Sequence, residues 1–433
     1  MLAKMAPPFL ADIYEEHLAE AAFRWSQWER ALAAPDYNLE ETARVEELLL
    51  AHLDGLVLGG APVADEVLRP ALDSEEPLYG ASALWALLEG NVNFSEADVL
   101  ALLRTSAPEK PGPLKRVLEL SEQRSVDDAL CPLLQPQATE APLQALALDV
   151  QAFRGALPKQ LALDLLQHSD PRVVAAALRG LCPLSGDVAT RELPRLLLDG
   201  HPEVRQAAIE TGIISGSRMA WAQCRAVAEE RKDAGRWALV LLAQSGEEGD
   251  LPRVIECSRV ASLRADALLA LGFSGRVQAV EVCLELMAHA PLAALAGEAF
   301  SAITGLRLEQ PYVLLPEEQD FLPPLEEDLA QELTLRPEDA LPVPDATAVA
   351  AWWRGARKDF SPGTRYLRGR VFNTATLLEE LEQGVMRSRP VHALSLAIRT
   401  HGGRRLQTRA FTRRQRAQLQ EARAARRGHA DLP

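Results

Sequence analysis

Apolar residues in the middle of this chain recur every three or four positions, in stripes separated by more polar stretches. Two of these stripes consist of Val173, Ala176, Ala177 and Leu181, and of Val204, Ala207, Ala208 and Gly212. This spacing places the side chains on one face of an α-helix. The small residues in the middle of each stripe allow neighbouring helices to approach closely. We therefore expect one amphipathic helix at each stripe.

The first apolar residues of the stripes fall into a register. The register positions are Leu78, Leu114, Leu143, Val173, Val204, Gly235, Leu263 and Leu292, at intervals of 36, 29, 30, 31, 31, 28 and 29 residues. A repeat of this length holds two short helices and buries its apolar face only by stacking on its neighbours. The register predicts an all-α, right-handed α-solenoid of short repeats of about 30 residues.

Proline marks most of the predicted helix starts. Six prolines precede register positions directly or by two residues: Pro77, Pro113, Pro142, Pro171, Pro202 and Pro291. At the first positions of a helix the missing N–H of proline is not needed. The repeats at Gly235 and Leu263 lack this mark and are the weakest assignments, with Asp266 where the other repeats have alanine or leucine.

The flanks of the repeats differ from the repeats themselves. Amphipathic patterns predict helices over residues 11–34 and 39–53, the second ending at Gly55. A stack of repeats needs such a cap, because its end would otherwise expose apolar surface. Trp25 and Trp28 share one helix face and are expected to anchor the cap. The predicted division is a cap over 1–60 and repeats over 61–308.

Charge changes sign after the repeats. Glu309–Asp345 holds eleven acidic residues, one basic residue and seven prolines, which predicts a linker over 309–347. Residues 346–433 hold eighteen Arg or Lys and six Asp or Glu. We expect a divergent helical region over 348–433, with helices near 349–358, 374–382, 389–399 and 412–427. Its basic surface either covers the acidic linker intramolecularly or attracts an acidic partner.

Composition limits the function classes. The 433 residues are 48% hydrophobic, 25% charged and 5% aromatic, with a net charge of −15, which argues against a general binder of phosphate backbones. The five cysteines form no Cys-x-x-Cys pair and are expected to be reduced thiols in helix cores. No signal-peptide core or membrane span is expected, so we expect a cytoplasmic protein.

Motifs that carry chemistry are missing from the sequence. There is no His-Glu-x-x-His, no phosphate-binding glycine loop and no complete Gly-x-Ser-x-Gly elbow. We therefore predict no enzyme activity, no catalytic residue, no metal and no cofactor, and leave the partner-binding residues open. A basic residue at the second helix position of four repeats is expected to form a salt-bridged or solvated row: Lys115, Arg205, Arg236 and Arg264.

The segment Pro202-Glu203-Val204-Arg205-Gln206-Ala207-Ala208 resembles the core of short HEAT-like repeats. Some proteins with such repeats are enzymes, including phycobilin lyases and a DNA glycosylase class that uses tryptophans beside a carboxylate. A phycobilin-lyase-like activity is the weakest alternative that we carry. In a glycosylase-like groove, Trp221 and Trp237 would be the tryptophans, but the net charge of the repeats is acidic.

A wider resemblance spans nearly the whole chain. It rests on segments that include 17–23, 51–56, 296–305, 341–345 and 363–369. These segments look like those of an uncharacterised proteobacterial family of HEAT-like proteins, often encoded beside type VI secretion genes. The resemblance implies a protein partner, either a secreted effector that the chain neutralises as an immunity protein or a secretion component that it serves as an adaptor. It transfers no catalytic residue.

The basic tail leaves a second function class open. Six arginines could contact the phosphates of a nucleic acid: Arg404, Arg405, Arg409, Arg413, Arg414 and Arg416. The acidic charge of the rest of the chain favours a protein partner over a nucleic acid.

Overall fold

The computed structural model describes residues 10–90, 92–105, 112–135, 140–230, 235–245, 247, 249–314 and 336–427. In these residues the fold is all-α, as predicted, apart from a hairpin of two short antiparallel strands, β1 (Tyr366–Leu367) and β2 (Arg370–Val371). The chain divides into two compact units. Unit 1 comprises Met1–Leu32, Tyr37–Ala220 and Ala397–Pro433, and unit 2 comprises Ala33–Asp36 and Trp221–Leu396.

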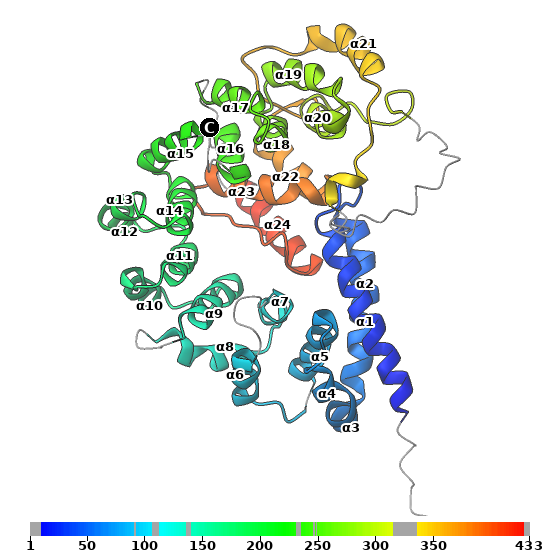
Figure 1. The fold of residues 1–433 in the computed structure, drawn as a ribbon, viewed down its shortest axis with the longest axis vertical. Coiled ribbons are helices and arrows are strands. Elements are labelled where there is room, and N and C mark those ends of the chain that lie inside the picture. The colour runs from blue at the N-terminus through cyan, green and yellow to red at the C-terminus, as the bar shows by residue number, and fades with distance from the viewer. Residues whose placement is uncertain are drawn as a thin grey trace, which may run out of the picture. The chain divides into compact units, whose positions relative to one another are not determined.

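Most helices follow one another with short connections, and a longer segment lies between α20 and α21 (Figure 1). Those of the first half are α1 (Ala11–Ala31), α2 (Leu39–Leu58), α3 (Gly60–Val63), α4 (Arg69–Ala71), α5 (Pro77–Glu89), α6 (Glu96–Thr105), α7 (Gly112–Leu120), α8 (Arg124–Leu130), α9 (Ala141–Arg154), α10 (Lys159–Asp164), α11 (Pro171–Gly180), α12 (Gly186–Arg191), α13 (Leu193–Leu196) and α14 (Pro202–Ile214). The second half contains α15 (Arg218–Glu230), α16 (Gly235–Gln244), α17 (Asp250–Ser258), α18 (Arg264–Ser274), α19 (Val277–Met287), α20 (Ala290–Thr304), α21 (Ala346–Ala356), α22 (Thr374–Gln383), α23 (Arg389–Arg399) and α24 (Thr412–Arg427).

Each register position lies at or beside the start of a helix. The helices concerned are α5, α7, α9, α11, α14, α16, α18 and α20, so the weakly marked repeats at Gly235 and Leu263 also form helices. Within unit 1, α5, α7, α9, α11 and α14 pack against one another in that order. Within unit 2, α18 packs against both α16 and α20. This packing order is consistent with the predicted stack of repeats.

Small residues set the distance between these helices. Ala176 and Ala177 of α11 are fully buried. Gly272 of α18 faces α20 so closely that a Cβ atom there would lie 2.9 Å from the Cα atom of Ala299. A larger residue at position 272 would therefore push the two helices apart. The small central positions of the stripes are packing positions, as predicted from their pattern.

The predicted cap forms a pair of long helices in unit 1. Helices α1 and α2 pack on each other and on α5. Trp25 and Trp28 are fully buried, which confirms that they anchor the cap. Their rings meet edge to face at 6.4 Å between centroids. The predicted end of the second helix at Gly55 was wrong, because α2 continues to Leu58 and Gly55 gives room to the ring of His17.

The four helices predicted after the linker are present as α21, α22, α23 and α24. Of the predicted linker, residues 315–335 lie outside the described residues. Its two ends are joined: Leu314 donates its backbone N–H to Val343, and Asp345 donates to Tyr312. The described ends of the segment are therefore held together by backbone hydrogen bonds.

The cysteines follow the prediction with one exception. Cys182, Cys224, Cys257 and Cys283 are buried free thiols, but Cys131 is exposed where a short 3-10 helix follows α8. No single helix in the described residues is long and apolar enough to span a bilayer. The helices Leu39–Leu58 and Gly60–Ala71 have the length and composition of a membrane span only when they are taken together. They are bent by 105° at the break between them.

Candidate functional site

The C-terminal segment, residues 404–427, lies along the stacked helices of unit 1. Figure 1 shows its helix α24 on the inner side of the row formed by α5, α7, α9, α11 and α14. The segment is an arginine-rich polypeptide, and several of its side chains contact those helices. The segment therefore packs on unit 1 as a peptide ligand would. Its contacts show which side chains and backbone groups this surface of unit 1 binds.

An aromatic cluster anchors the start of the segment. The Phe411 ring lies 5.1 Å from the Trp28 ring and 5.3 Å from the Trp85 ring, between centroids. Trp25 completes the cluster, with its ring 6.3 Å from that of Trp85. Such ring pairs add to the free energy of burying their apolar surface. The cluster joins α1, α5 and the residue before α24.

A buried carboxylate caps the first turn of α24. Glu46 is 4% exposed and accepts two hydrogen bonds from Thr412 to Oε1, from the backbone N–H at 3.0 Å and from Oγ1 at 2.8 Å. The Thr412 N–H also lies 2.8 Å from Oε2, which accepts a further hydrogen bond from Trp28 Nε1 at 3.1 Å. The positive end of the helix dipole favours a negative group at this place. Glu46 therefore takes the part of an N-cap residue from a helix that is distant in sequence.

Two effects act on the pKa of Glu46. Burial disfavours the charged carboxylate and raises its pKa above the usual value of 4.5. The hydrogen bonds from Thr412 and Trp28, together with the charge of Arg416, act in the opposite direction. Desolvation is the larger effect, so the net shift is upward.

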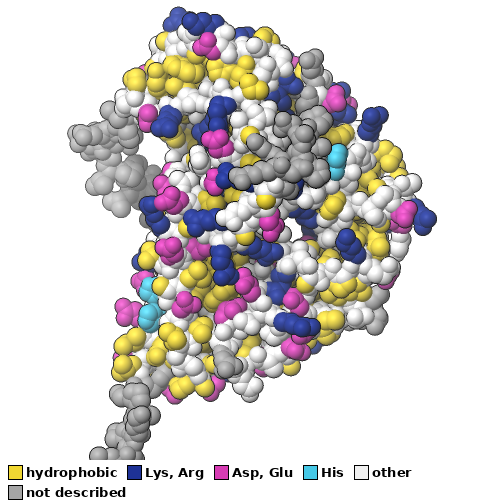
Figure 2. Space-filling view, turned by 180° about the vertical axis from the view of Figure 1, so that it is seen from behind, with side chains coloured by type: hydrophobic (Ala, Val, Ile, Leu, Met, Phe, Trp, Pro, Cys, Tyr) yellow, Lys and Arg dark blue, Asp and Glu magenta, His cyan; other side chains and the backbone are white. Residues whose placement is uncertain are grey.

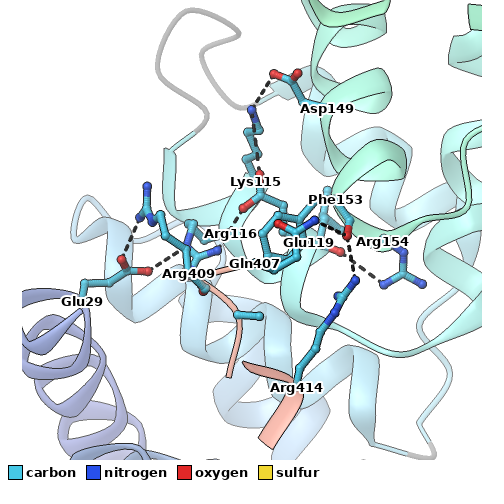
Figure 3. Close-up of polar contacts among 12 residues, drawn as sticks. Glu29, Lys115, Arg116, Glu119, Asp149, Phe153, Arg154, Gln407, Arg409 and Arg414 are labelled. Atoms are coloured by element: carbon cyan, nitrogen blue, oxygen red, sulfur yellow. Dashed lines mark hydrogen bonds and ion pairs between the residues drawn. The ribbon is translucent and has the colours of Figure 1, made fainter. Parts of the chain in front are cut away.

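Glu29 joins the segment to α7 through two arginines (Figure 3). Arg116 of α7 binds Glu29 at 2.8 Å and Glu119 at 3.0 Å, and donates to the backbone oxygen of Arg409 at 2.7 Å. Arg409 in turn binds Glu29 at 2.8 Å. The Arg116 side chain is only 9% exposed. Its several hydrogen bonds compensate for burying its charge.

Three side chains of the segment donate to backbone oxygens at the C-terminal ends of α9 and α11. Arg414 donates to the oxygen of Phe153 at 2.8 Å and lies 5.3 Å from the Phe153 ring centroid, and Gln407 donates to the same oxygen at 3.3 Å. Arg405 donates to the oxygen of Cys182 at 2.7 Å. Helix C-termini leave carbonyl groups unpaired and carry partial negative charge. Guanidinium groups donate hydrogen bonds to these carbonyl groups and carry the opposite charge.

The predicted row of basic helix-start residues is used within the chain, as expected. Lys115 binds Asp149 at 2.8 Å and Arg236 binds Asp266 at 2.9 Å. Arg205 and Arg264 donate instead to backbone oxygens of the preceding turn. The row is therefore a set of intramolecular contacts.

The arginines that we nominated for nucleic-acid contact are largely engaged in unit 1. Arg405, Arg409 and Arg414 make the contacts described above, Arg413 binds Glu122 at 2.7 Å, and Arg404 donates to the backbone oxygen of Ala422. Arg416 is exposed. The acidic stretch 315–335 of the predicted linker lies outside the described residues, so the expectation that the tail covers it stays a prediction, and the described contacts of these arginines are with unit 1. Further upstream, Arg387 does bind Glu338 of the linker region, at 3.1 Å.

The two central residues of this site, Glu46 and Phe411, were not predicted from the sequence. Glu46 lies on the same helical stripe as Leu39, Ala43, Leu49 and Leu53, which are all buried. An acidic residue on an apolar stripe signals a buried partner, so the pattern contained a clue. Phe411 is a single aromatic residue in a basic segment, and no pattern around it indicates a partner.

The described residues contain no group of three or more His, Cys, Asp or Glu side chains placed to hold a metal ion. No protein-family model matches the chain, and no curated protein matches it.

Proposed function

We propose that this protein is a non-catalytic, protein-binding scaffold built as a right-handed α-solenoid of short HEAT-like repeats. The observation that supports the proposal is that unit 1 already holds a polypeptide, the segment 404–427. It does so with an aromatic anchor at Phe411 and arginines directed at carboxylates and carbonyl oxygens. Aromatic and arginine anchors are also what dominates binding between separate proteins.

The more specific proposal is an immunity or adaptor role in type VI secretion. It rests on the family resemblance of the sequence. A stack of repeats offers an extended surface, and a stable complex buries on the order of 800 Å² on each partner. In the immunity role the scaffold covers the effector's active surface, and in the adaptor role it presents the effector to the secretion machinery.

Co-purification tests this proposal directly. The full-length chain is expressed with the tagged product of the adjacent gene, and in parallel with a non-cognate effector as the matched control. We expect a stable complex with the adjacent product alone, and rescue of cells that express it if the role is immunity. A complex without rescue assigns the adaptor role. The absence of both complex and rescue would remove the secretion proposal.

A nucleic-acid-binding role receives little support from the contacts of the tail. Five of the six nominated arginines make hydrogen bonds or ion pairs within unit 1. On the face drawn in Figure 2, Lys and Arg side chains are interspersed with Asp and Glu side chains. A phosphate-binding surface needs a net positive potential. Filter binding at two salt concentrations decides the matter, since a nucleic-acid binder loses affinity as salt rises.

A further inference from the structure

Unit 2 contains a half-open pocket of about 230 Å³. Its walls come mainly from α18, α20, the chain just after α20, residues 341–342 and the chain before α23. The apolar part of the lining includes Leu269, Phe273, Leu308, Leu341 and Val385. The charged part consists, among the described residues, of Arg307, Arg368 and Glu298. A small number of polar groups among apolar walls is typical of a site for a small ligand.

The acid of this lining is compensated within the chain. Glu298 accepts a hydrogen bond through Oε1 from Nε of Arg387 at 2.8 Å. Its Oε2 is shielded from solvent and therefore does not face the pocket. Arg387 is only 8% exposed and also binds Glu338 at 3.1 Å, so the pair is held in place. The pocket therefore does not recognise a ligand through this carboxylate.

Arg307 is the opposite case. It lies shortly after the end of α20 and is exposed. Its side chain makes no hydrogen bond or ion pair with the part of the chain that the structure describes. A guanidinium group offers five N–H donors in a planar fork that matches a carboxylate. All of the Arg307 donors are thus available to an anion at the pocket.

Arg368 reaches the pocket from the turn of the β1–β2 hairpin. Its φ of 49° lies in the left-handed region that favours glycine. The backbone N–H groups of Arg368 and Gly369 donate to Ala302 at 2.9 Å and to Ile303 at 2.8 Å, in the last turn of α20. These bonds satisfy carbonyl groups at the helix end and fix the turn there. The hairpin therefore holds Arg368 at the wall that α20 forms.

The ion pair of Arg368 presents its positive end to the pocket. Nε of Arg368 donates to Oε1 of Glu380 at 3.0 Å, and the two terminal nitrogens have no hydrogen bond among the described residues. The Arg368 side chain is 33% exposed, whereas that of Glu380 is 8% exposed. Arg368 lines the pocket and Glu380 does not. A molecule in the pocket therefore meets the arginine of this pair.

A buried histidine beside the pocket is surrounded by positive charge. His392 is 6% exposed, and its ring lies 5.4 Å from that of Phe273, which lines the pocket. Burial is the main reason that the pKa of His392 is lowered to about 3. Three positive charges lower this pKa further: those of Arg368, Arg389 and Arg365. The Phe273 wall thus adjoins a region of positive potential.

We propose that this pocket binds a carboxylate on an apolar body, with Arg307 and Arg368 as the donors and the hydrocarbon against the apolar walls. A single negative charge suits one unpaired and one partly paired arginine. A free small carboxylic acid and the C-terminal carboxylate of another polypeptide share this chemistry. The proposal goes beyond the scaffold function and does not depend on it, because every residue of the site belongs to unit 2.

The experiment is a calorimetric and NMR titration of the full-length chain with hexanoate and with N-acetyl-leucine, whose carboxylate stands for a chain terminus. Hexanamide is the neutral analogue, and each titration is run at low and at high salt. Arg307→Gln removes the unpaired cation without breaking a described contact, and Ala302→Leu narrows the pocket from α20. Arg354→Gln on α21 is the matched control, because Arg354 is equally exposed and lies outside the lining.

We expect millimolar binding of hexanoate that weakens as the salt concentration rises. Binding should fall about threefold or more in Arg307→Gln and about tenfold or more in Ala302→Leu, with no change in Arg354→Gln. If N-acetyl-leucine also binds, the source of the carboxylate is a chain terminus, and binding of hexanoate alone assigns a free acid.

Four results would overturn the proposal. Equal binding of hexanamide and hexanoate would show that the charge is not recognised. Equal losses in Arg307→Gln and Arg354→Gln would show a general attraction to surface arginines. Saturation that Ala302→Leu leaves unchanged would place the ligand outside the pocket, and the absence of saturable binding by both acids would remove the site.

Discussion

Glu46 of unit 1 is buried and Glu298 of unit 2 is half-buried, and these two helical carboxylates differ in how their oxygens are satisfied. Burial raises the pKa of both. Both oxygens of Glu46 accept hydrogen bonds from the chain itself, from Thr412 and Trp28. Glu298 has one oxygen bound to Arg387 and one without a partner among the described residues.

This difference separates a carboxylate whose two oxygens are satisfied by the chain from one that is satisfied only in part. Glu46 fixes the start of α24 and leaves nothing for an outside molecule to satisfy. Glu298 is held by Arg387 through Oε1, and its Oε2 is shielded from solvent without a donor among the described residues. A carboxylate oxygen that is shielded from solvent and has no donor is unfavourable in the folded chain, whereas the two oxygens of Glu46 carry no such cost.

The largest effect is expected from removing the structural carboxylate. Glu46→Ala leaves the N–H groups of Thr412 and Trp28 without their acceptor, so we expect a loss of about 3 kcal/mol in the free energy of unfolding of unit 1. Denaturant unfolding measures it. Glu47→Ala is the matched control, because Glu47 is exposed on the same helix, and it should change stability by about 0.5 kcal/mol or less. Equal effects of the two variants would show that the cap contributes little.

The pH dependence of stability sharpens the assignment of Glu46. Its pKa in the folded state lies above 4.5, so its contribution to stability is fully present below pH 4.5 and is lost as the pH rises through the raised pKa. The Glu46→Gln variant does not titrate there. As the pH rises, the unfolding free energy of the wild-type chain should therefore fall relative to that of Glu46→Gln. A shift in the opposite direction would mean that the bonds to the ionised form outweigh burial.

The smallest effect is expected at the exposed end of the Glu29 contacts. Arg409 is 59% exposed, so Arg409→Ala should cost about 0.5 kcal/mol or less. Arg116→Ala should cost more, about 2 kcal/mol, because this side chain is buried and makes three contacts. Thermal and denaturant unfolding at low and moderate salt compares the two. If Arg409→Ala lowered the unfolding free energy as much as Arg116→Ala, the exposed ion pair with Glu29 would contribute more to stability than its exposure predicts.

Much of the helical framework could be predicted from the pattern of apolar residues. The stripes that begin at Val173 and Val204 gave α11 and α14, because the 3.6-residue period and a proline at the helix start act locally. Helix α24 was predicted with its observed bounds, although no proline marks its start at Thr412. The end of α2 was missed, because Gly55 has a packing role beside His17 rather than a terminating one.

The sites could not be predicted, because they join residues that are distant in sequence. No local pattern pairs Glu46 with Thr412, and neither residue belongs to a known sequence motif. The ion pair between Arg387 and Glu298 of α20 joins distant residues of unit 2 in the same way. Both acids lie on predicted helices, but their partners could not be read from the sequence.

The hydrogen bond between Thr412 and Glu46 spans 366 residues, and this separation has a consequence for the order of events during synthesis. At typical elongation rates, roughly 20 to 70 seconds pass between the emergence of the two residues. Throughout that time Glu46 keeps its contact with water, and the tryptophans of the cap lack the Phe411 ring. The first helices to be made are therefore among the last to reach their final surroundings.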